Sequence, residues 1–322
     1  ECCPVNNSSK EFIFVLHGLN DSRTNKHIYF AFGLVVYIVT LFVNLTLIIT
    51  IILEKTLHEP MYLFICNLFL NGICGASAFY PKILADLFLD SNIISYTGCL
   101  IQMYIIYCYL FSEFTSLTVM AYDRYVAICK PLEYHNVMTQ QKVVNLMIFI
   151  WIFSLLQVSV ATVLTVQTPL CGNDIDKLYC FNWDVVKLSC TDVTVNNVYS
   201  YIIMFFQFFQ AVFIIISYTR IIRAALKSKT ERVKFMQTCL PHLITLINFT
   251  ISVLFDVLCA RYGKGQELQT LRNILGIEFL VVPPLLNPII YGLKMNQIRQ
   301  IVVVIQVLQR NLEMNFFRQE HM

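Results

Sequence analysis

The stretch Met120–Tyr134 reads MAYDRYVAICKPLEY, and it closes a long apolar run that begins at Leu100 and carries one earlier acid, Glu113. An arginine in a membrane helix is costly unless it reaches the interface or pairs with an acid. Arg124 directly follows Asp123 at the end of this run, where a cation also suits the helix dipole. The pair is therefore either an interfacial anchor or a latch that, once broken, frees Arg124 for a cytoplasmic partner.

The composition is that of a membrane protein. Apolar residues make up 57% of the 322 residues and charged residues 13%, whereas a soluble domain carries about 25% charged residues. The net charge is only +3, and no basic run with interleaved aromatics indicates a nucleic-acid partner. No basic segment followed by a short apolar stretch opens the chain, so we expect no cleavable signal peptide and insertion by the first span.

Seven stretches with few or no charges are long enough to cross a bilayer, which takes about 20 residues. They are Ile28–Leu53, Met61–Pro81, Leu100–Ile128, Val143–Val166, Val198–Thr219, Phe235–Phe255 and Leu271–Leu293. The residues after them, Lys294–Gln309, have apolar side chains at helical spacing, which is typical of an amphipathic helix on the membrane surface. The sequence predicts an all-α membrane protein with an extracellular tail (1–27), a seven-helix bundle (28–293), and a cytoplasmic amphipathic helix and tail (294–322).

Orientation follows from the basic residues, which gather on the cytoplasmic side of membrane proteins. They are densest between the fifth and sixth spans, in the predicted loop Arg220–Lys234, so we expect the N-terminus outside and the C-terminus inside. Glycosylation sequons at Asn6, Asn7 and Asn20 agree with an outer tail. The sequons at Asn44 and Asn248 lie in spans and are not expected to be used.

Three motifs together carry a family resemblance. Met120–Tyr134, HEPMY at His58–Tyr62 and NPIIY at Asn287–Tyr291 resemble the odorant-receptor branch of the rhodopsin-like G-protein-coupled receptors, over roughly residues 12–300. HEPMY with the Asn71–Gly72 pair resembles the fish members, which implies water-soluble odorants. The resemblance also implies a small odorant ligand, a heterotrimeric G protein that acts through cyclic AMP, no enzymatic activity, no cofactor, and a place in the plasma membrane of olfactory cilia.

The resemblance assigns a switch at the inner face. Pro288 interrupts the helical ladder of the seventh span, which gives that helix a place to pivot. The resemblance implies that Tyr218 and Tyr291 swing toward Arg124 in the active state. The predicted G-protein switch consists of Asp123, Arg124, Tyr125, Tyr218, Asn287, Pro288 and Tyr291.

Four cysteines, Cys99, Cys171, Cys180 and Cys190, fall on the predicted outer side, where disulfides persist. Four cysteines allow three connectivities, and the residues alone do not choose among them. The family resemblance implies bridges between Cys99 and Cys180 and between Cys171 and Cys190.

Glu113 lies about three helical turns before Arg124, on the same face of the third span. An acid at mid-membrane depth is a functional candidate. It could bind sodium, carry a proton, or simply accept hydrogen bonds within the bundle. The family usually offers a second acid from the second span, but alignment from Pro60 places Gly72 there, so an ion site built on two acids is not expected.

Bundles of this kind bind ligands in their outer half. Counting from the motifs gives a largely apolar lining of Ile106, Tyr107, Leu110, Phe111, Ile202, Ile203, Phe206, Thr250, Val253, Leu254 and Val257. Three charges, Asp256, Arg261 and Glu278, lie near the expected mouth. Arg261 either binds a carboxylate or sulfate through two hydrogen bonds or is solvated in the outer loop.

Other classes of membrane protein fit less well. The sequence of a transporter would be expected to show internal symmetry or paired broken helices, and this sequence shows neither. A membrane enzyme predicts a catalytic motif such as HExxH, GxSxG or a P-loop, which is missing from the sequence. A receptor of the same fold for another small ligand stays open, although Ile106 occupies the zone where an amine receptor would place an acid.

Overall fold

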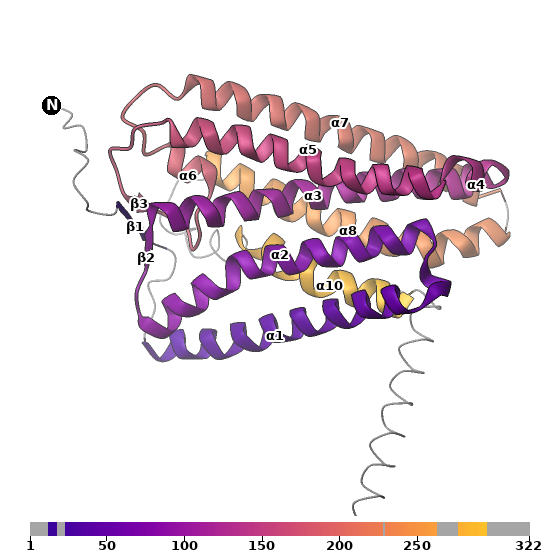
Figure 1. Cartoon of the computed structure of the whole chain (residues 1–322), viewed down its shortest axis with the longest axis horizontal. Coiled ribbons are helices and arrows are strands. Elements are labelled where there is room, and N and C mark those ends of the chain that lie inside the picture. The colour runs from indigo at the N-terminus through magenta and orange to yellow at the C-terminus, as the bar shows by residue number, and fades with distance from the viewer. Residues whose placement is uncertain (1–11, 18–22, 228, 263–275, 295–322) are drawn as a thin grey trace, which may run out of the picture.

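The structure is a computed structural model that describes residues 12–17, 23–227, 229–262 and 276–294. Within them, seven long helices run side by side as a bundle (Figure 1). The helices are α1 (Arg23–Leu53), α2 (Pro60–Leu89), α3 (Tyr96–Cys129), α5 (Gln140–Val166), α7 (Thr194–Ala225), α8 (Lys229–Tyr262) and α10 (Glu278–Lys294). Five of them are long and apolar enough to cross a membrane, and α8 and α10 contain shorter apolar helical segments, Cys239–Phe255 and Glu278–Gly292. The predicted seven-helix membrane bundle is confirmed.

The centre of the bundle is α3. In the most apolar 18-residue stretch of α3, about 72% of the residues are buried inside the protein, whereas in the corresponding stretch of α7 only 17% are buried. The exposed side chains of the outer helices are mostly large and apolar, as a lipid-facing surface requires. Polar and charged side chains on α3 therefore point into the protein, and any that lack partners there would be costly.

The predicted second span ends too early. The structure continues α2 through Pro81 to Leu89, where a loop was expected to begin at Lys82. An ion pair between Lys82 and Asp86, one helical turn apart, lies within this extension. The helix ends at Asp90, whose φ of 52° is left-handed.

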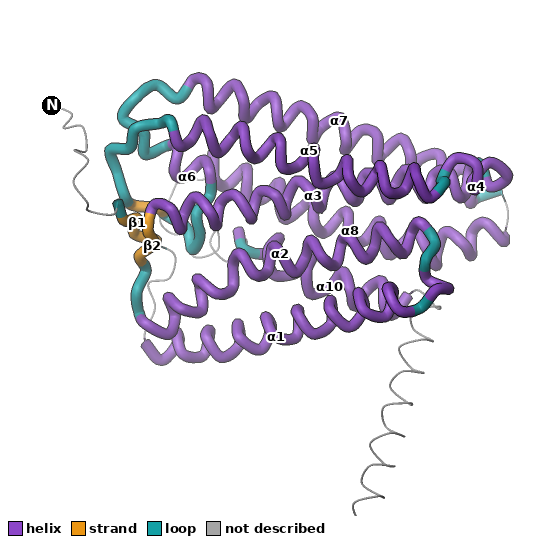
Figure 2. Tube along the Cα trace, viewed as in Figure 1, coloured by secondary structure: helices purple, strands orange, loops and turns teal. Residues whose placement is uncertain are grey.

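A small sheet covers the outer end of the bundle (Figure 2). Its central strand is β1 (Ile13–Leu16), from the predicted N-terminal tail. It pairs antiparallel with β2 (Ile93–Ser95) and parallel with β3 (Asp174–Ile175). Phe14 and Leu16 of β1 are buried against α3 and the second outer loop, which also contains the short helix α6 (Asn182–Val186).

Short helices replace the predicted loops on the inner side. They are η1 (Lys55–Leu57), η2 (Pro131–Glu133) and α4 (Tyr134–Val137). The predicted third inner loop is mostly helical, because α7 extends to Ala225 and α8 begins at Lys229. Apart from Lys294, the predicted amphipathic helix 294–309 lies outside the described residues.

Candidate functional site

The predicted ion pair is present at the inner end of α3. Nε of Arg124 donates to Oδ2 of Asp123 at 2.9 Å, and a second guanidinium nitrogen donates to the same oxygen. Asp123 is 1% exposed and Arg124 7% exposed. The charges therefore neutralise each other in a buried setting, where breaking the pair would be costly.

Tyr134, in α4, completes this arrangement. Its hydroxyl donates to the other carboxylate oxygen of Asp123 at 2.9 Å. Burial, followed by the nearby charge of Asp123, raises the pKa of Tyr134 above its ordinary value, so the phenol stays a donor. Tyr134 belongs to the motif Met120–Tyr134, but nothing in that motif predicted that the loop would fold back onto Asp123.

Two of the predicted switch tyrosines, Tyr125 and Tyr218, have partners on neighbouring helices. Tyr218 of α7 hydrogen-bonds Nδ1 of His242 of α8, and the two rings stack with centroids 5.6 Å apart. Arg220 lies over the Tyr125 ring and donates to its hydroxyl at 3.3 Å. His242 was not among the predicted switch residues, and its contact with Tyr218 was not predicted.

Asn287, Pro288 and Tyr291 lie on α10 and face the interior. Tyr291 is fully buried beside the Phe69 ring of α2. Nδ2 of Asn287 donates to Oε1 of Glu113 at 2.9 Å. The predicted pivot of α10 is thus tied to the buried acid of α3.

Glu113 is held by two amides. Nδ2 of Asn71 donates to its Oε2 at 2.7 Å, opposite Asn287. The residue of α2 that faces Glu113 is therefore Asn71, whereas the sequence alignment placed Gly72 there. A Cβ added to Gly72 would instead meet Pro284 of α10 at 3.4 Å.

This shell does not fit a sodium ion held by two acids. The residue that α2 presents to Glu113 is Asn71, whose side-chain nitrogen donates to Oε2, so the second ligand group from α2 is an amide and not a carboxylate. Among the described residues, no cluster of His, Cys, Asp and Glu could hold a metal ion.

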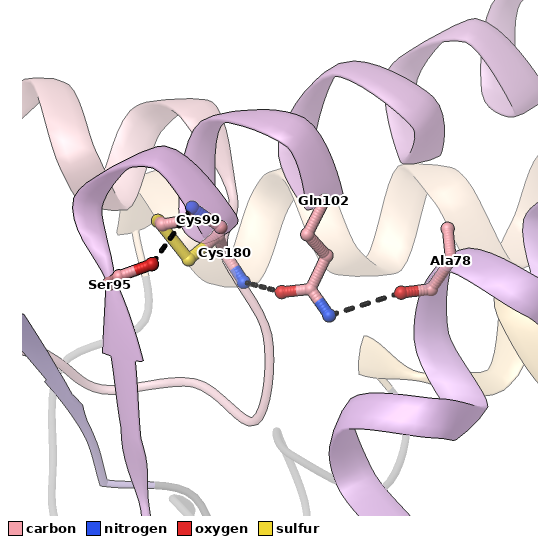
Figure 3. The surroundings of a disulfide bond; sticks show 6 residues. Ala78, Ser95, Cys99, Gln102 and Cys180 are labelled. Carbon is pink, nitrogen blue, oxygen red and sulfur yellow. Dashed lines mark hydrogen bonds between the residues drawn. A yellow bond between two sulfur atoms is a disulfide. The ribbon is translucent and has the colours of Figure 1, made fainter.

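Two disulfides fix the second outer loop. Cys99 is bonded to Cys180, and Cys171 to Cys190, with Cα atoms 5.4 and 5.2 Å apart. Both are the pairs that the resemblance implied. Figure 3 shows Gln102 beside the first bridge, accepting the Cys180 amide hydrogen at 3.0 Å and donating to the carbonyl of Ala78 at 3.2 Å. The loop is therefore joined to both α3 and α2.

The predicted ligand lining divides into two groups. Ile106, Leu110 and Phe111 are buried on α3, and the partly buried members are Tyr107, Ile203, Thr250, Val253 and Glu278. Three predicted members lie on outward faces instead, since Ile202 and Phe206 are each 45% exposed and Leu254 is 54% exposed. The side chains of Asp256, Val257 and Arg261, near the end of α8, lie outside the described residues.

A small cavity lies beside the inward group. Its volume is about 10 Å³, and it is lined by Met103, Tyr107, Val158, Ala161, Thr162 and Asn182. That is room for about one water molecule. Four of these residues come from α5 and α6, which the sequence-based lining did not include, because nothing in their sequence distinguishes them from ordinary packing residues.

The predicted glycosylation sites Asn6, Asn7 and Asn20 lie outside the described residues. Asn44, the sequon residue in the first span, is fully buried in α1. Its amide nitrogen donates to the carbonyl of Pro284 at 2.8 Å, so it serves helix packing.

Comparisons with known proteins agree on one family. A family model described as "Olfactory receptor" matches residues 32–310. Olfactory receptor 4E2 of Mus musculus is 34% identical, over 90% of this chain and 92% of its own length. Olfactory receptor 56A1 of Homo sapiens is 38% identical, over 80% of this chain and 82% of its own length. Squid rhodopsin superposes with a TM-score of 0.71 at 16% identity, covering 87% of this chain and 80% of its own, which shows the same fold.

Proposed function

This chain belongs to the olfactory receptor family of rhodopsin-like G-protein-coupled receptors, and we propose that it binds a small odorant in the outer half of its bundle. Binding activates a heterotrimeric G protein at the inner face and raises cyclic AMP. The receptor lies in the plasma membrane of olfactory cilia with its N-terminus outside.

The proposal that the chain activates a G protein rests on the ion pair between Asp123 and Arg124, which is formed in this structure. The guanidinium is buried and engaged, so it does not face the cytoplasm. Tyr134 bonds the same carboxylate, which makes the inner loop part of the latch. If the pair between Asp123 and Arg124 opened, a G protein could contact both the Arg124 guanidinium and the loop that carries Tyr134.

The ligand site is proposed around the cavity between α3, α5 and α6. Tyr107 and Met103 provide aromatic and apolar surface, and Thr162 and Asn182 provide polar groups. Oδ1 of Asn182 already accepts a hydrogen bond from Thr165 at 2.6 Å. Since the cavity has room for about one water molecule, an odorant must displace side chains in order to bind. This displacement would couple ligand binding to a change in the bundle.

The charge of the odorant is the finer part of the proposal. The fish-type resemblance favours water-soluble ligands, and Arg261 at the outer end of α8 would anchor their carboxylate or sulfate groups. Glu278 is the competing charge at the start of α10, and it would favour an amine instead.

The test is a cyclic AMP assay in cells that express the chain. A panel of amino acids, organic sulfates, amines and neutral odorants is applied to the wild type and to Arg124→Ala at equal surface level. A response of the wild type that the variant lacks supports the proposal. Silence of the wild type toward the whole panel, with no Arg124-dependent basal signal, contradicts it.

A further inference from the structure

The seventh span contains three prolines, Pro283, Pro284 and Pro288. Proline has no amide hydrogen, so the carbonyl four residues earlier loses its helical donor. For Pro283 that carbonyl belongs to Phe279, and for Pro288 it belongs to Pro284. A buried carbonyl without a donor destabilises the fold, so each is expected to find a partner elsewhere.

Both carbonyls find their donor on another helix. The hydroxyl of Tyr109, in α3, donates to the Phe279 carbonyl at 2.8 Å. The amide of Asn44, in α1, donates to the Pro284 carbonyl at 2.8 Å. At these two carbonyls, side chains of α3 and α1 therefore take the place of the missing backbone donors and tie α10 to both helices.

Tyr109 could not reach Phe279 without Gly75 of α2. A Cβ added to Gly75 would lie 2.5 Å from Cγ of the Tyr109 ring, closer than atoms can approach. The ring also packs edge-on against Phe249 of α8, with centroids 6.2 Å apart. Tyr109 is thus buried where α2, α3, α8 and α10 meet.

Its neighbours Tyr107 and Phe111 on α3 belong to the predicted ligand lining, which we call the ligand wall. Tyr107 lines the small cavity, and its ring contacts Phe111. A shift of α3 near Tyr107 would also move the Tyr109 hydroxyl. This hydroxyl is hydrogen-bonded to the carbonyl of Phe279 in α10. Farther along α10 lie Asn287 and Tyr291 of the predicted switch.

We propose that Tyr109 is a positioning residue that holds α10 in the resting state and passes movement of the ligand wall to that helix. This inference rests on the proposed receptor function. The hydrogen bond to the Phe279 carbonyl is the link, and Gly75 provides the space that the link needs.

The test compares Tyr109→Phe with a matched control on the same helix. Tyr109→Phe keeps the ring and removes only the hydroxyl. Tyr104→Phe also removes one hydroxyl, but the hydroxyl of Tyr104 forms its hydrogen bond with Ser159 of α5, at 3.1 Å, and not with α10. Basal cyclic AMP, measured without any ligand at equal surface level, is expected to rise about 2- to 10-fold in Tyr109→Phe, as the loss of one hydrogen bond allows. Tyr104→Phe should match the wild type.

A second readout does not depend on signalling. Hydrogen exchange of purified receptor should speed up in residues 276–290 for Tyr109→Phe and not for Tyr104→Phe. Unchanged exchange there overturns the inference even if the receptor signals normally. Equal effects of the two variants on basal signal or on exchange would also overturn it. A silent wild type with faster exchange in Tyr109→Phe would leave the link to α10 standing but overturn both the proposed function and the signalling role of Tyr109.

Gly75→Ala tests the packing step. It should reduce surface expression strongly, because the new methyl overlaps the Tyr109 ring. Gly75→Ala combined with Tyr109→Leu should regain surface expression, since the overlapping ring is gone. Normal expression of Gly75→Ala alone, or no recovery in the double variant, contradicts the fit between the two residues.

Discussion

The hydroxyl of Tyr134 lies 2.9 Å from the carboxylate of Asp123, so the loop that follows α3 closes over the ion pair that ends it. Asp123 then has one oxygen on Arg124 and the other on Tyr134. In the proposed function, a G protein that drew Tyr134 away would weaken the hold on Arg124, and a freed Arg124 would release Tyr134. The two events are therefore coupled.

Replacing Tyr134 with Phe should raise basal signalling. The variant keeps the ring but leaves one oxygen of Asp123 without its donor, which weakens the resting state by about 0.5–1.5 kcal/mol. We expect basal cyclic AMP to rise about 2- to 10-fold at equal surface level. Basal activity equal to the wild type would show that Tyr134 only fills space.

Arg124→Ala should abolish G-protein signalling while leaving surface expression largely intact. Asp123→Asn should instead raise basal signalling, because the neutral amide no longer pairs with the guanidinium. Cyclic AMP is measured beside surface labelling of each variant. Full signalling by Arg124→Ala at wild-type surface level contradicts the latch.

Peptide mapping without reduction should recover Cys99 linked to Cys180 and Cys171 linked to Cys190. Each pair has Cα atoms within the range that a disulfide spans. Recovery of Cys99 with Cys171 or Cys190 would refute the assignment. Losing the Cys99 bridge should cost surface expression, because it ties the second outer loop to α3.

Ligand charge can be tested at the outer end of α8. A charge-assisted hydrogen bond contributes roughly 1.5–3 kcal/mol, so Arg261→Ala should lower the potency of a carboxylate or sulfate agonist about 10- to 100-fold. A neutral agonist should keep its potency. If amines are the best agonists, and Glu278→Gln weakens them while Arg261→Ala does not, then the site selects cations.

Glu113→Ala should destabilise the receptor. Asn71 and Asn287 would each lose a buried acceptor, and an unpaired buried donor costs about 1–3 kcal/mol. Glu113→Gln should be milder, because its amide oxygen still accepts one of the two hydrogens. Thermal unfolding of the purified receptor in detergent measures both, and an alanine variant as stable as the wild type would refute this role.

The spans could be predicted from the sequence because long charge-free stretches have few alternatives to crossing a bilayer. The end of the second span could not. Pro81 was taken as a terminus, yet a membrane helix tolerates proline where neighbouring groups satisfy the freed backbone. The cap strand Ile13–Leu16 was also missed, because its pairing partners lie far away in the chain.

The site was predicted less evenly than the fold. Motifs located Asp123, Arg124 and Asn287 because their residue types are unusual in a membrane. Counting along a helix was less reliable, since one residue turns a side chain by about 100°. For this reason the alignment placed Gly72 opposite Glu113, where the structure has Asn71. It also placed Phe206, whose side chain is 45% exposed, in the ligand wall. Tyr109 carries no charge and belongs to no motif, so only the structure reveals its link to α10.

The outer sheet has a consequence for how the receptor is made. Its central strand, β1, leaves the ribosome first, yet β3 is synthesised only after α5. β2 and α3 can cover part of Phe14 and Leu16 earlier, but their cover is complete only when β3 and the second outer loop follow. Exposed apolar side chains of this kind are what chaperones bind. Assembly of the cap thus marks a chain whose first four spans have been synthesised. A chain truncated before β3 would keep part of this apolar surface exposed.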